Sequence, residues 1–494
     1  RLLCFCVIIY PNMASIDELK QERLDKLNAL EKSASSAYPA KNNNYIFIDQ
    51  FLADFNAENK TEFTLVGRIM TKRSFGALAF AKLFDGTSTT QIVFEEAHSK
   101  EAVNFFEQFV DSGDFVEVIG VSYVTKKGEN SLLVNEIKML SKALLPLPDK
   151  WEGLQDEEMK MRYRYLDILT SDDLRDMLIK KAKFWQVVRN FLNENKFLEV
   201  ETPTIETTTG GAEARPFKTY HNDFAIDVYM RICVGELWQK RLMAAGIPRT
   251  YEIGRAYRNE GSSPEHLQEF TNCEFYMAYA DYKDGMKLVQ DLYRKIASEV
   301  FGKTKFEIRG HTFDLADEWT EVDYADEIKK QTGIDIWSAS DDEIKDKLEE
   351  LHVKYDGENR ERLTDTIWKY CRKNISGPAF LINHPLLVAP LAKPNTDGRT
   401  AQQFQPILAG SEVGRGYSEL NDPRLQRANF EQQQKLLDAG DEEAMMPDWE
   451  FVEMLEHGMP PTCGFGFGER LFAFLMEKPI RETQTFPLVK PKES

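Results

Sequence analysis

Cysteine and histidine are scarce in this chain, which has six cysteines and seven histidines among 494 residues. No two cysteines form a CxxC pair, so the usual ligand spacing of a zinc site is missing. Isolated cysteines are typical of a reducing compartment, and we expect a cytoplasmic protein. No apolar run approaches the ~20 residues of a membrane-spanning helix, so we expect no membrane partner.

Basic residues are also fewer than acidic ones, with 62 Lys and Arg against 81 Asp and Glu, which gives a net charge of -19. The molecule as a whole repels polyanions, and any contact with nucleic acid requires a local surface of different charge. Disorder is excluded by composition, since 42% of the residues are hydrophobic and 12% are aromatic. A chain of this length typically holds two or three domains.

The first 61 residues contain two different segments, a short apolar stretch and a charged helical stretch. Residues 1–12 read RLLCFCVIIYPN, a basic residue before a short apolar stretch, which a signal peptide would also show. Because the chain does not begin with Met and Met13 opens a helix-like segment, we interpret residues 1–12 as a translated upstream extension. Residues 13–61 are predicted to form a helical arm, beginning with a capping box of Ser15 and Glu18.

Residues 62–145 are rich in strand-forming residues. Strands are predicted at 63–70, 78–84, 90–94, 115–124 and 131–140, with a helix at 99–110. This order is typical of a five-stranded OB barrel, a fold often used on single-stranded nucleic acid, although other small barrels share it. Residues 146–160, with Pro146 and Pro148, are predicted to be a linker. Residues 161–494 alternate helical and strand patterns, as in one large α+β domain with a charged helical insertion at 303–375.

A predicted hairpin in the large domain carries the clearest chemical pattern. Residues 250–258 and 270–276 form two strands, and alternation assigns their side chains to faces. One face holds Phe270, Asn272, Glu274 and Tyr276 on the second strand, and another holds Glu252, Gly254, Ala256 and Arg258 on the first. If the faces meet in a cleft, it suits an activated nucleotide and a zwitterion. The same pattern alone also fits an amphipathic hairpin with a half-buried ion pair.

Three stretches then appear in order: FLEVETP at 197–203, YRNEG at 257–261 with EF at 269–270, and GFGFGER at 464–470. They resemble motifs 1, 2 and 3 of class II aminoacyl-tRNA synthetases. The wider match is to lysyl-tRNA synthetases, through GGAEARPF, EFYMAYADY, SELNDP and HGMPPT, and covers nearly the whole chain from Met13. The resemblance implies an OB-fold anticodon-binding domain and a class II catalytic domain, built on an antiparallel sheet flanked by helices.

The resemblance also implies roles for residues. Arg258 and Arg470 are the catalytic arginines, the first bridging the ATP α-phosphate and the substrate carboxylate, the second holding the γ-phosphate. The implied ATP site comprises Arg258, Glu260, His266, Phe270, Glu412, Gly468 and Arg470. The implied Mg²⁺ ligands are Glu412 and Gln405. The implied lysine site comprises Gly211, Glu236, Arg258, Glu274, Tyr276, Tyr417 and Glu419. Two carboxylates and a phenol suit the ε-ammonium, whereas an aspartate or asparagine site would show a cationic partner.

The implied partners are tRNA(Lys), ATP, L-lysine and a second copy of the chain, since motif 1 forms the twofold interface of class II enzymes. In the barrel, the residues that match the anticodon-reading positions are Arg73, Phe80, Gln91 and Glu129. Taken singly, Phe80 would be a core residue and Glu129 a turn residue.

Four positions depart from the family pattern. Gln405 replaces an acid, Arg415 replaces an asparagine, Glu469 replaces an aspartate, and residues 232–236 are one residue longer, which predicts a bulge before Glu236. We expect Arg415 to point to pyrophosphate or to an acidic neighbour. Two other hypotheses remain beside lysine–tRNA ligation. One is a ligase that attaches lysine to protein, whose relatives lack the barrel, and the other is a catalytically weakened tRNA-binding paralogue.

Overall fold

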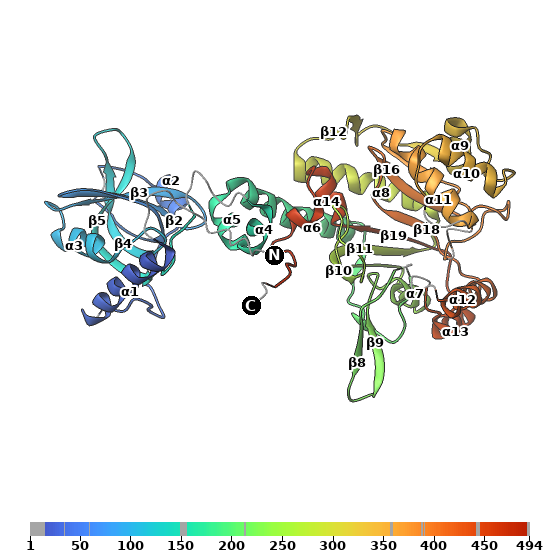
Figure 1. Ribbon diagram of the computed structural model, residues 1–494, viewed down its shortest axis with the longest axis horizontal. Coiled ribbons are helices and arrows are strands. Elements are labelled where there is room, and N and C mark those ends of the chain that lie inside the picture. Colours follow the sequence, from blue (N-terminus) through green and yellow to red (C-terminus); the bar gives the residue numbers. More distant parts are fainter. Residues whose placement is uncertain are drawn as a thin grey trace, which may run out of the picture. The chain divides into compact units, whose positions relative to one another are not determined.

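A computed structural model describes residues 15–33, 35–58, 60–148, 156–211, 214–355, 359–386, 389, 391–440 and 445–491. The chain divides into two compact units, Arg1–Lys160 and Met161–Ser494 (Figure 1). The predicted extension, residues 1–12, lies outside the described residues, as does part of the predicted linker. Within those ranges, no helix has the length and apolar character that crossing a membrane requires.

The first unit contains a closed five-stranded barrel with strand order β1-β2-β3-β5-β4. Its strands and helix are β1 (Glu62–Phe75), β2 (Leu78–Phe84), β3 (Thr89–Glu95), α3 (Lys100–Phe109), β4 (Phe115–Val124) and β5 (Asn130–Ser141). The predicted barrel is confirmed, and β1 runs further than expected, to Phe75. Helix α3 closes the barrel core by stacking Phe106 on Phe94, with ring centroids 4.1 Å apart.

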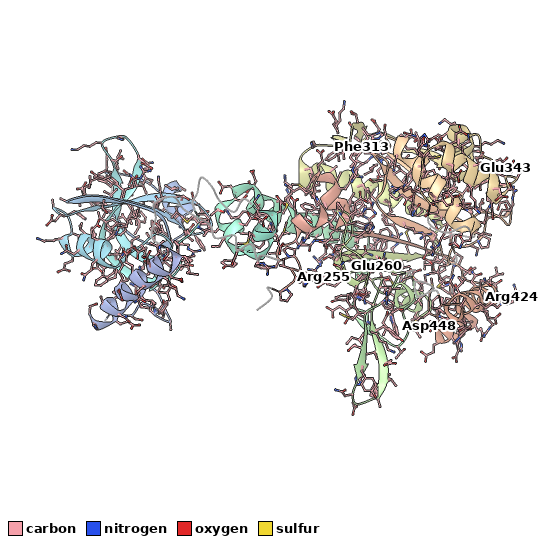
Figure 2. The ribbon with its side chains drawn as sticks, viewed as in Figure 1. Arg255, Glu260, Phe313, Glu343, Arg424 and Asp448 are labelled. Carbon is pink, nitrogen blue, oxygen red and sulfur yellow. The ribbon has the colours of Figure 1, made fainter. Side chains whose placement is uncertain are left out.

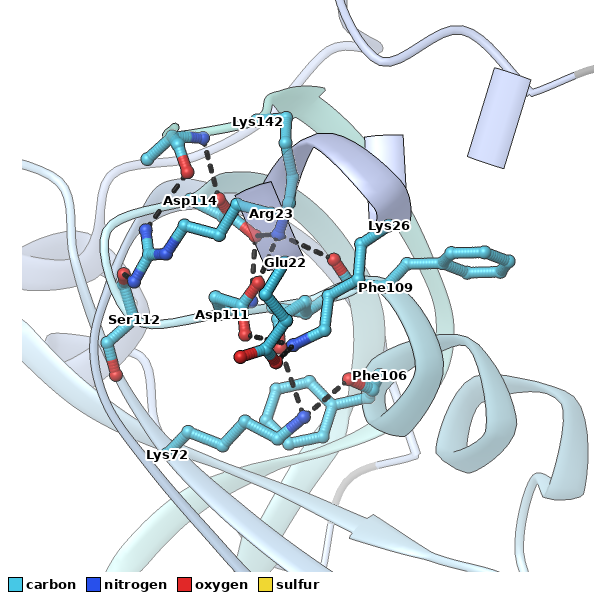
Figure 3. Close-up of polar contacts among 12 residues, drawn as sticks. Glu22, Arg23, Lys26, Lys72, Phe106, Phe109, Asp111, Ser112, Asp114 and Lys142 are labelled. Atoms are coloured by element: carbon cyan, nitrogen blue, oxygen red, sulfur yellow. Dashed lines mark hydrogen bonds and ion pairs between the residues drawn. The ribbon is translucent and has the colours of Figure 1, made fainter. Parts of the chain in front are cut away.

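A buried polar cluster attaches the first helix, α1 (Ile16–Lys32), to the barrel (Figure 3). The ammonium of Lys142 has no exposed surface and lies 2.6 Å from Asp111 and 2.7 Å from Asp114. From α1, Lys26 reaches Asp111 at 2.7 Å, and Arg23 donates to three main-chain carbonyl groups of the barrel. Paired buried charges of this kind specify one arrangement of helix and barrel. A short helix, α2 (Ile48–Ala53), completes this part.

The second unit is built on one central sheet of strand order β14-β15-β16-β18-β19-β11-β10-β6, with β17 beside β16. Its strands are β6 (Leu198–Glu199), β10 (Arg249–Tyr257), β11 (Glu269–Ala278), β14 (Thr320–Asp323), β15 (Ala379–Ile382), β16 (Gln403–Leu408), β17 (Ser411–Glu412), β18 (Arg415–Ser418) and β19 (Thr462–Gly468). The predicted fold class is confirmed. The inner pairs are antiparallel, whereas the outermost pair at each end of the sheet is parallel.

One face of the sheet packs on two long helices, α6 (Asp172–Glu194) and α8 (Tyr282–Ile296). Ser171 caps α6 by accepting from the Leu174 N–H, and two aspartates follow in the first turn, where the helix dipole favours negative charge. On β11 and β19, alternate residues such as Cys273, Phe275 and Phe465 enter this core. The residues between them therefore lie on the opposite face, which the helices leave open.

The remaining elements lie outside the central sheet. They are α4 (Glu157–Arg162), α5 (Arg164–Thr170), β7 (Ile205–Glu206), β8 (Lys218–His221), β9 (Ile226–Met230), α7 (Glu236–Ala244), a π-helix (Ala297–Phe301), α12 (Pro423–Asp438), α13 (Trp449–His457), α14 (Arg470–Leu475) and 3₁₀ turns at Arg372–Asn374 and Ile480–Thr483. Strands β7, β9 and β8 form a separate small sheet.

The predicted helical insertion at 303–375 is only partly helical. It begins with a hairpin of β12 (Lys305–Ile308) and β13 (His311–Asp314), and β14 then joins the central sheet. The helices α9 (Tyr324–Thr332), α10 (Asp341–Glu350) and α11 (Arg360–Cys371) follow. They share one hydrophobic cluster with residues of β15 and β16, so they pack on the sheet and do not form a separate core. The prediction overlooked the alternating apolar residues of β12 and β13, which favour strands.

Candidate active site

A cavity of about 460 Å³ lies over the open face of the sheet. It is lined by every predicted site residue of the larger unit, although these residues come from segments far apart in the chain. They are Gly211, Glu236, Arg258, Glu260, His266, Phe270, Glu274, Tyr276, Gln405, Glu412, Tyr417, Glu419, Gly468 and Arg470.

Strand β11 forms the floor of this cavity. Its alternation places Phe270, Asn272, Glu274 and Tyr276 against the cavity, as the sequence predicted. At ~3.4 Å per residue, Phe270 and Tyr276 are ~20 Å apart along the strand. The cavity is therefore long enough for a nucleotide and an amino acid placed end to end.

The first strand of the predicted hairpin contributes less to the cavity than predicted. Of Glu252, Gly254, Ala256 and Arg258, which were predicted to share a face, only Arg258 lines the cavity. The carboxylate of Glu252 is engaged by the buried guanidinium of Arg231 at 2.6 Å. A Cβ on Gly254 would lie 2.2 Å from that guanidinium, so Arg231 occupies the space beside this strand. The prediction of a shared cleft was wrong for Glu252. A buried carboxylate needs a charged or hydrogen-bonding partner, and Arg231 provides it outside the cavity.

Cationic and aromatic side chains gather at the Phe270 end. The guanidinium of Arg258 lies over the Phe270 ring, 5.4 Å from its centroid, and its Nε donates to the Ile232 carbonyl at 3.3 Å. Arg470, the first residue of α14, forms an ion pair with Glu265 in the β10–β11 loop. Arg309, at the β12–β13 turn, also reaches Glu265, at 2.6 Å. Two guanidinium groups thus converge on a single carboxylate, an arrangement that suits a phosphate equally well.

The loop between β10 and β11 supplies the other polar groups at this end. Glu260, beside β10 in Figure 2, accepts from the main-chain N–H of Arg215 at 3.3 Å. His266 Nδ1 lies 2.7 Å from the Ser263 hydroxyl. Burial and the charge of Arg470 lower the pKa of His266, so its imidazole is neutral at pH 7 and can accept or donate one hydrogen bond.

Glu412 and Gln405, the predicted metal ligands, lie on neighbouring strands of the cavity wall. The Trp368 indole donates to Glu412 Oε1 at 2.7 Å, and Gln405 Oε1 lies 2.8 Å from His384 Nε2. The pair offers one carboxylate and one amide oxygen. Because Mg²⁺ in nucleotide sites takes one or two carboxylates and completes its shell with phosphate and water, this donor set fits a Mg²⁺ ion that would be bound together with ATP.

The Tyr276 end is acidic and contains three buried carboxylates, Glu236, Glu274 and Glu419. Glu274 accepts from the Val234 N–H at 2.7 Å and from the Tyr276 hydroxyl at 3.0 Å. Burial and the neighbouring Glu236 raise the pKa of Glu274. Crowded carboxylates in a closed site favour a cationic ligand, because each lacks a full countercharge.

The three glycines of β19 make room for these side chains. A Cβ on Gly464 would lie 2.2 Å from Glu419 Oε1 and 2.4 Å from the Tyr276 ring. A Cβ on Gly466 would lie 3.2 Å from Glu274 Cγ. The first two glycines of the GxGxG pattern therefore allow close packing of the acidic side chains, whereas a Cβ on Gly468 would lie 3.1 Å from Asn272 Oδ1.

Residues 232–235 do not form the predicted strand bulge. Strand β9 ends at Met230, and the extra residue is absorbed in a bent segment whose last residue, Gly235, has φ 70 before α7 begins. Nearby, Arg415 is exposed on the cavity wall and donates to Gln403 Oε1 at 3.3 Å. Glu469 is fully buried and accepts from the Thr271 N–H at 2.8 Å.

Cys233, Glu236 and Glu274 bring a thiol and two carboxylates within 4.8 Å of one another, a spacing that could hold a metal ion. Burial raises the pKa of Cys233 well above its ordinary value, and its Sγ lies 3.2 Å from the Gly210 carbonyl. The thiol thus stays protonated and is a poor ligand. The two carboxylates remain suited to an ammonium group.

In the barrel, three of the predicted anticodon residues lie on the adjoining strands β1, β2 and β3, and Glu129 lies in the turn before β5. Arg73 on β1 is directly opposite Phe80 on β2, and Gln91 on β3 is opposite Lys82. Phe80 lies between the buried Ala79 and Ala81, so its ring points away from the barrel core. Glu129 forms an ion pair with Lys82.

Sequence reasoning missed several residues of the cavity and its surroundings. They are Arg231, Lys240, Glu265, Arg309, Trp368, His384 and Gln403. Lys240 offered one signal, since it follows Glu236 by four residues in a helical segment and such pairs meet on one face. The others have partners in distant segments that no local spacing indicates.

Comparison with known proteins agrees with this geometry. Residues 156–490 match the family model described as tRNA synthetases class II (D, K and N), and residues 63–140 match the OB-fold nucleic acid binding domain. The chain therefore belongs to the class II tRNA synthetases.

Curated relatives narrow the family. Proteins named lysine–tRNA ligase from Thermotoga sp. (strain RQ2) and Halalkalibacterium halodurans are each 39% identical to this chain, covering 97% of it and 97% and 98% of their own lengths. The one from Roseiflexus sp. (strain RS-1) is 40% identical, over 97% of this chain and 100% of its own. Within class II, the chain belongs to the lysine–tRNA ligase family.

Proposed function

We propose that this chain joins lysine to tRNA(Lys) in two steps at the expense of ATP. The observation that supports this most directly is the division of one cavity into a guanidinium end, with Arg258 and Arg470, and an acidic end, with Glu236, Glu274 and Glu419. ATP carries the negative charge that suits the first end, and lysine carries two ammonium groups for the second.

In the first step, a carboxylate oxygen of lysine attacks the α-phosphorus of ATP, and pyrophosphate leaves as the new bond forms. Arg258 belongs to the guanidinium end, and its guanidinium can bind both the α-phosphate and the attacking carboxylate in a bidentate manner. Adenine stacks on Phe270, and Arg470 exchanges Glu265 for the γ-phosphate. In the second step, a hydroxyl at the 3' end of tRNA attacks the lysyl carbonyl carbon and AMP leaves. Both steps depend on positioning and charge neutralisation.

The carboxylates of the acidic end would bind the two ammonium groups of lysine at separate points. Glu236 and the main chain at Gly211 receive the α-amino group, and Tyr417, whose hydroxyl donates to Glu236, fixes that carboxylate. Glu274, Tyr276 and Glu419 receive the ε-ammonium. Mg²⁺ would be held by Glu412 and Gln405, where it neutralises charge on the ATP phosphates.

The deciding experiment is ATP–pyrophosphate exchange with each of the twenty amino acids, followed by charging of tRNA(Lys). Lysine alone should support exchange, and the product should be lysyl-tRNA. Exchange without charging of tRNA would favour a ligase that lysylates protein, and no exchange at all would favour the tRNA-binding paralogue. Stimulation by aspartate or asparagine and not by lysine would contradict the lysine assignment.

The barrel is proposed to read the tRNA anticodon through Arg73, Phe80, Gln91 and Glu129. Phe80→Ala should reduce the kcat/KM for tRNA charging about 5- to 150-fold, because stacking is worth ~1–3 kcal/mol per base. Pyrophosphate exchange without tRNA should not change. A parallel loss of both activities would mean that Phe80 supports folding, and Phe75→Ala, on an exposed ring 6.3 Å from Phe80, reports the contribution of the neighbouring surface.

We also propose a homodimer. Large apolar side chains are exposed on α6 and on the small strands that follow it, among them Ile179 at 68%, Leu198 at 51% and Ile205 at 53%. Exposed apolar surface of this kind indicates a protein interface. Light scattering at micromolar concentration should give twice the chain mass, and Leu198→Asp should lower it. Leu425→Asp, at an equally exposed leucine on α12, is the matched control, and a monomer in the unmodified protein would contradict the proposal.

The proposed compartment is the cytoplasm. Cys233, Cys273, Cys371 and Cys463 are free and buried, which suits a reducing environment.

A further inference from the structure

Lys240 has a position that the proposed roles leave unexplained. It lies on α7, is 1% exposed, and its ammonium contacts two carboxylates of the cavity, Glu236 at 2.8 Å and Glu419 at 2.5 Å. Burial lowers the pKa of Lys240, but Glu236 and Glu419 raise it further, so the net shift is upward and the ammonium stays charged. A protein ammonium therefore connects the carboxylates assigned to the two ends of the substrate.

In each of these carboxylates, one oxygen contacts the Lys240 ammonium and the other oxygen lies beside a glycine of the cavity wall. Glu236 gives Oε1 to Lys240, while its Oε2 lies 2.9 Å from the place where a Cβ on Gly211 would be. Glu419 gives Oε2 to Lys240, while its Oε1 lies 2.2 Å from the corresponding place on Gly464. Both glycines line the cavity, so the second oxygens face the substrate space at two separate points.

The charges also balance around this bridge. Three carboxylates, Glu236, Glu274 and Glu419, with one ammonium from Lys240 leave two negative charges. Lysine brings two ammonium groups, and Arg258 meets its carboxylate. An amino acid with two positive charges thus leaves no unpaired charge at the acidic end. Buried ions are tolerated when each has a partner, because the pairing offsets their loss of hydration.

We propose that Lys240 sets the distance between the two ammonium-binding points, and thereby selects amino acids by the length of their side chain. This inference rests on the proposed function. Lys240 is a positioning residue, because it acts through Glu236 and Glu419 and does not touch the substrate. A shorter homologue such as ornithine has one methylene fewer between its two ammonium groups and would fit two points set for lysine less well. One methylene is typically worth about 10- to 200-fold in kcat/KM.

The test compares lysine with ornithine in ATP–pyrophosphate exchange, using Lys240→Met and Lys240→Gln. Once the bridge is removed, Glu236 and Glu419 can reorient, and the ratio of kcat/KM for lysine to that for ornithine should fall about tenfold or more. The Gln variant retains size and a donor, so it tests the proposal if the Met variant unfolds. Equal losses for lysine and ornithine in folded variants would overturn the inference, because a merely structural role lowers both together.

Arg241→Met is the matched control. Arg241 is the next residue of α7 and forms a part-buried ion pair with Asp448 at 2.9 Å, outside the residues that line the cavity. Its loss should change thermal stability but not the lysine-to-ornithine ratio. Failure of the proposed function would be seen separately, as absence of lysine-dependent exchange in the unmodified protein.

Discussion

Arg258→Ala and Arg470→Ala should each abolish lysine-dependent pyrophosphate exchange. Each removes a guanidinium from the Phe270 end of the cavity, where negative charge on the phosphates is greatest as the bond to pyrophosphate breaks. A charge-assisted contact made in the transition state is worth ~2.7–4 kcal/mol, or roughly a hundredfold to a thousandfold in rate. The loss should appear mainly in kcat for Arg258, which also orients the attacking carboxylate.

Arg255→Ala is the control for both variants. Arg255 is three residues before Arg258, and its exposed side chain is paired with the exposed Glu269 at 3.6 Å and, more distantly, with the buried Glu469 at 3.9 Å. Its loss should leave exchange within a few-fold of the unmodified rate, since surface pairs contribute ~0–1 kcal/mol. Near-normal exchange in Arg258→Ala or Arg470→Ala would refute the assignment of the phosphate end, provided that thermal unfolding shows both variants to be folded.

Glu274→Gln and Glu419→Gln should raise the KM for lysine by roughly a hundredfold or more, or abolish turnover. Removing one partner of a buried ion pair costs about 3–5 kcal/mol, because the ligand ammonium is left desolvated and unpaired. The KM for ATP should change little, since Glu274 and Glu419 belong to the acidic end. Steady-state exchange with lysine and ATP varied independently separates the two effects.

Glu206→Gln is the matched control for these variants. Glu206 is a mostly buried carboxyl outside the cavity, and burial raises its pKa to about 7. Because a Gln oxygen can accept the same hydrogen bond from the Trp238 indole that Glu206 Oε1 accepts at 2.8 Å, an amide should replace this carboxyl with little effect. An unchanged KM for lysine in Glu274→Gln or Glu419→Gln would place the ε-ammonium elsewhere.

The same carboxylates should make lysine binding depend on pH. Burial raises the pKa of Glu419, although the Lys240 ammonium opposes this, and the pKa of Glu274 is also raised. Lysine requires the ionised forms and keeps its own charge below pH 8. Its KM should therefore fall as pH rises from 6 to 8, and Glu419→Gln should weaken this dependence.

The local pattern was sufficient for much of the site. Alternation along β11 assigned Phe270, Asn272, Glu274 and Tyr276 to one face, and the cavity lies on that face. The prediction succeeded because the alternate residues Cys273, Phe275 and Met277 are apolar and enter the core with α6 and α8, so only one orientation buries them. The barrel was equally clear from short strands around an amphipathic helix.

Partners from distant segments could not be predicted in this way. Glu252 shares its strand face with Arg258 but is captured by Arg231, and Arg470 meets Glu265, 205 residues away in the chain. Local spacing carries no information about such contacts, because a buried charged group pairs with an oppositely charged group that the packing of distant segments places beside it.

The sequence by itself indicated a five-stranded barrel through its strand pattern, and its motifs, through the family that they resemble, implied the catalytic fold and the chemical types of side chain at the cavity. Strand alternation and motif order could be read because both are local properties of the chain. Only the tertiary structure decided which carboxylate remains available to a ligand. Lys240 shows why, since its pairing with Glu236 follows from helical spacing, but its contact with Glu419 joins α7 to a residue 179 positions further along the chain, which only the closed fold brings close. A buried ammonium takes the partners that the closed fold supplies, and those partners set which oxygens are left for substrate.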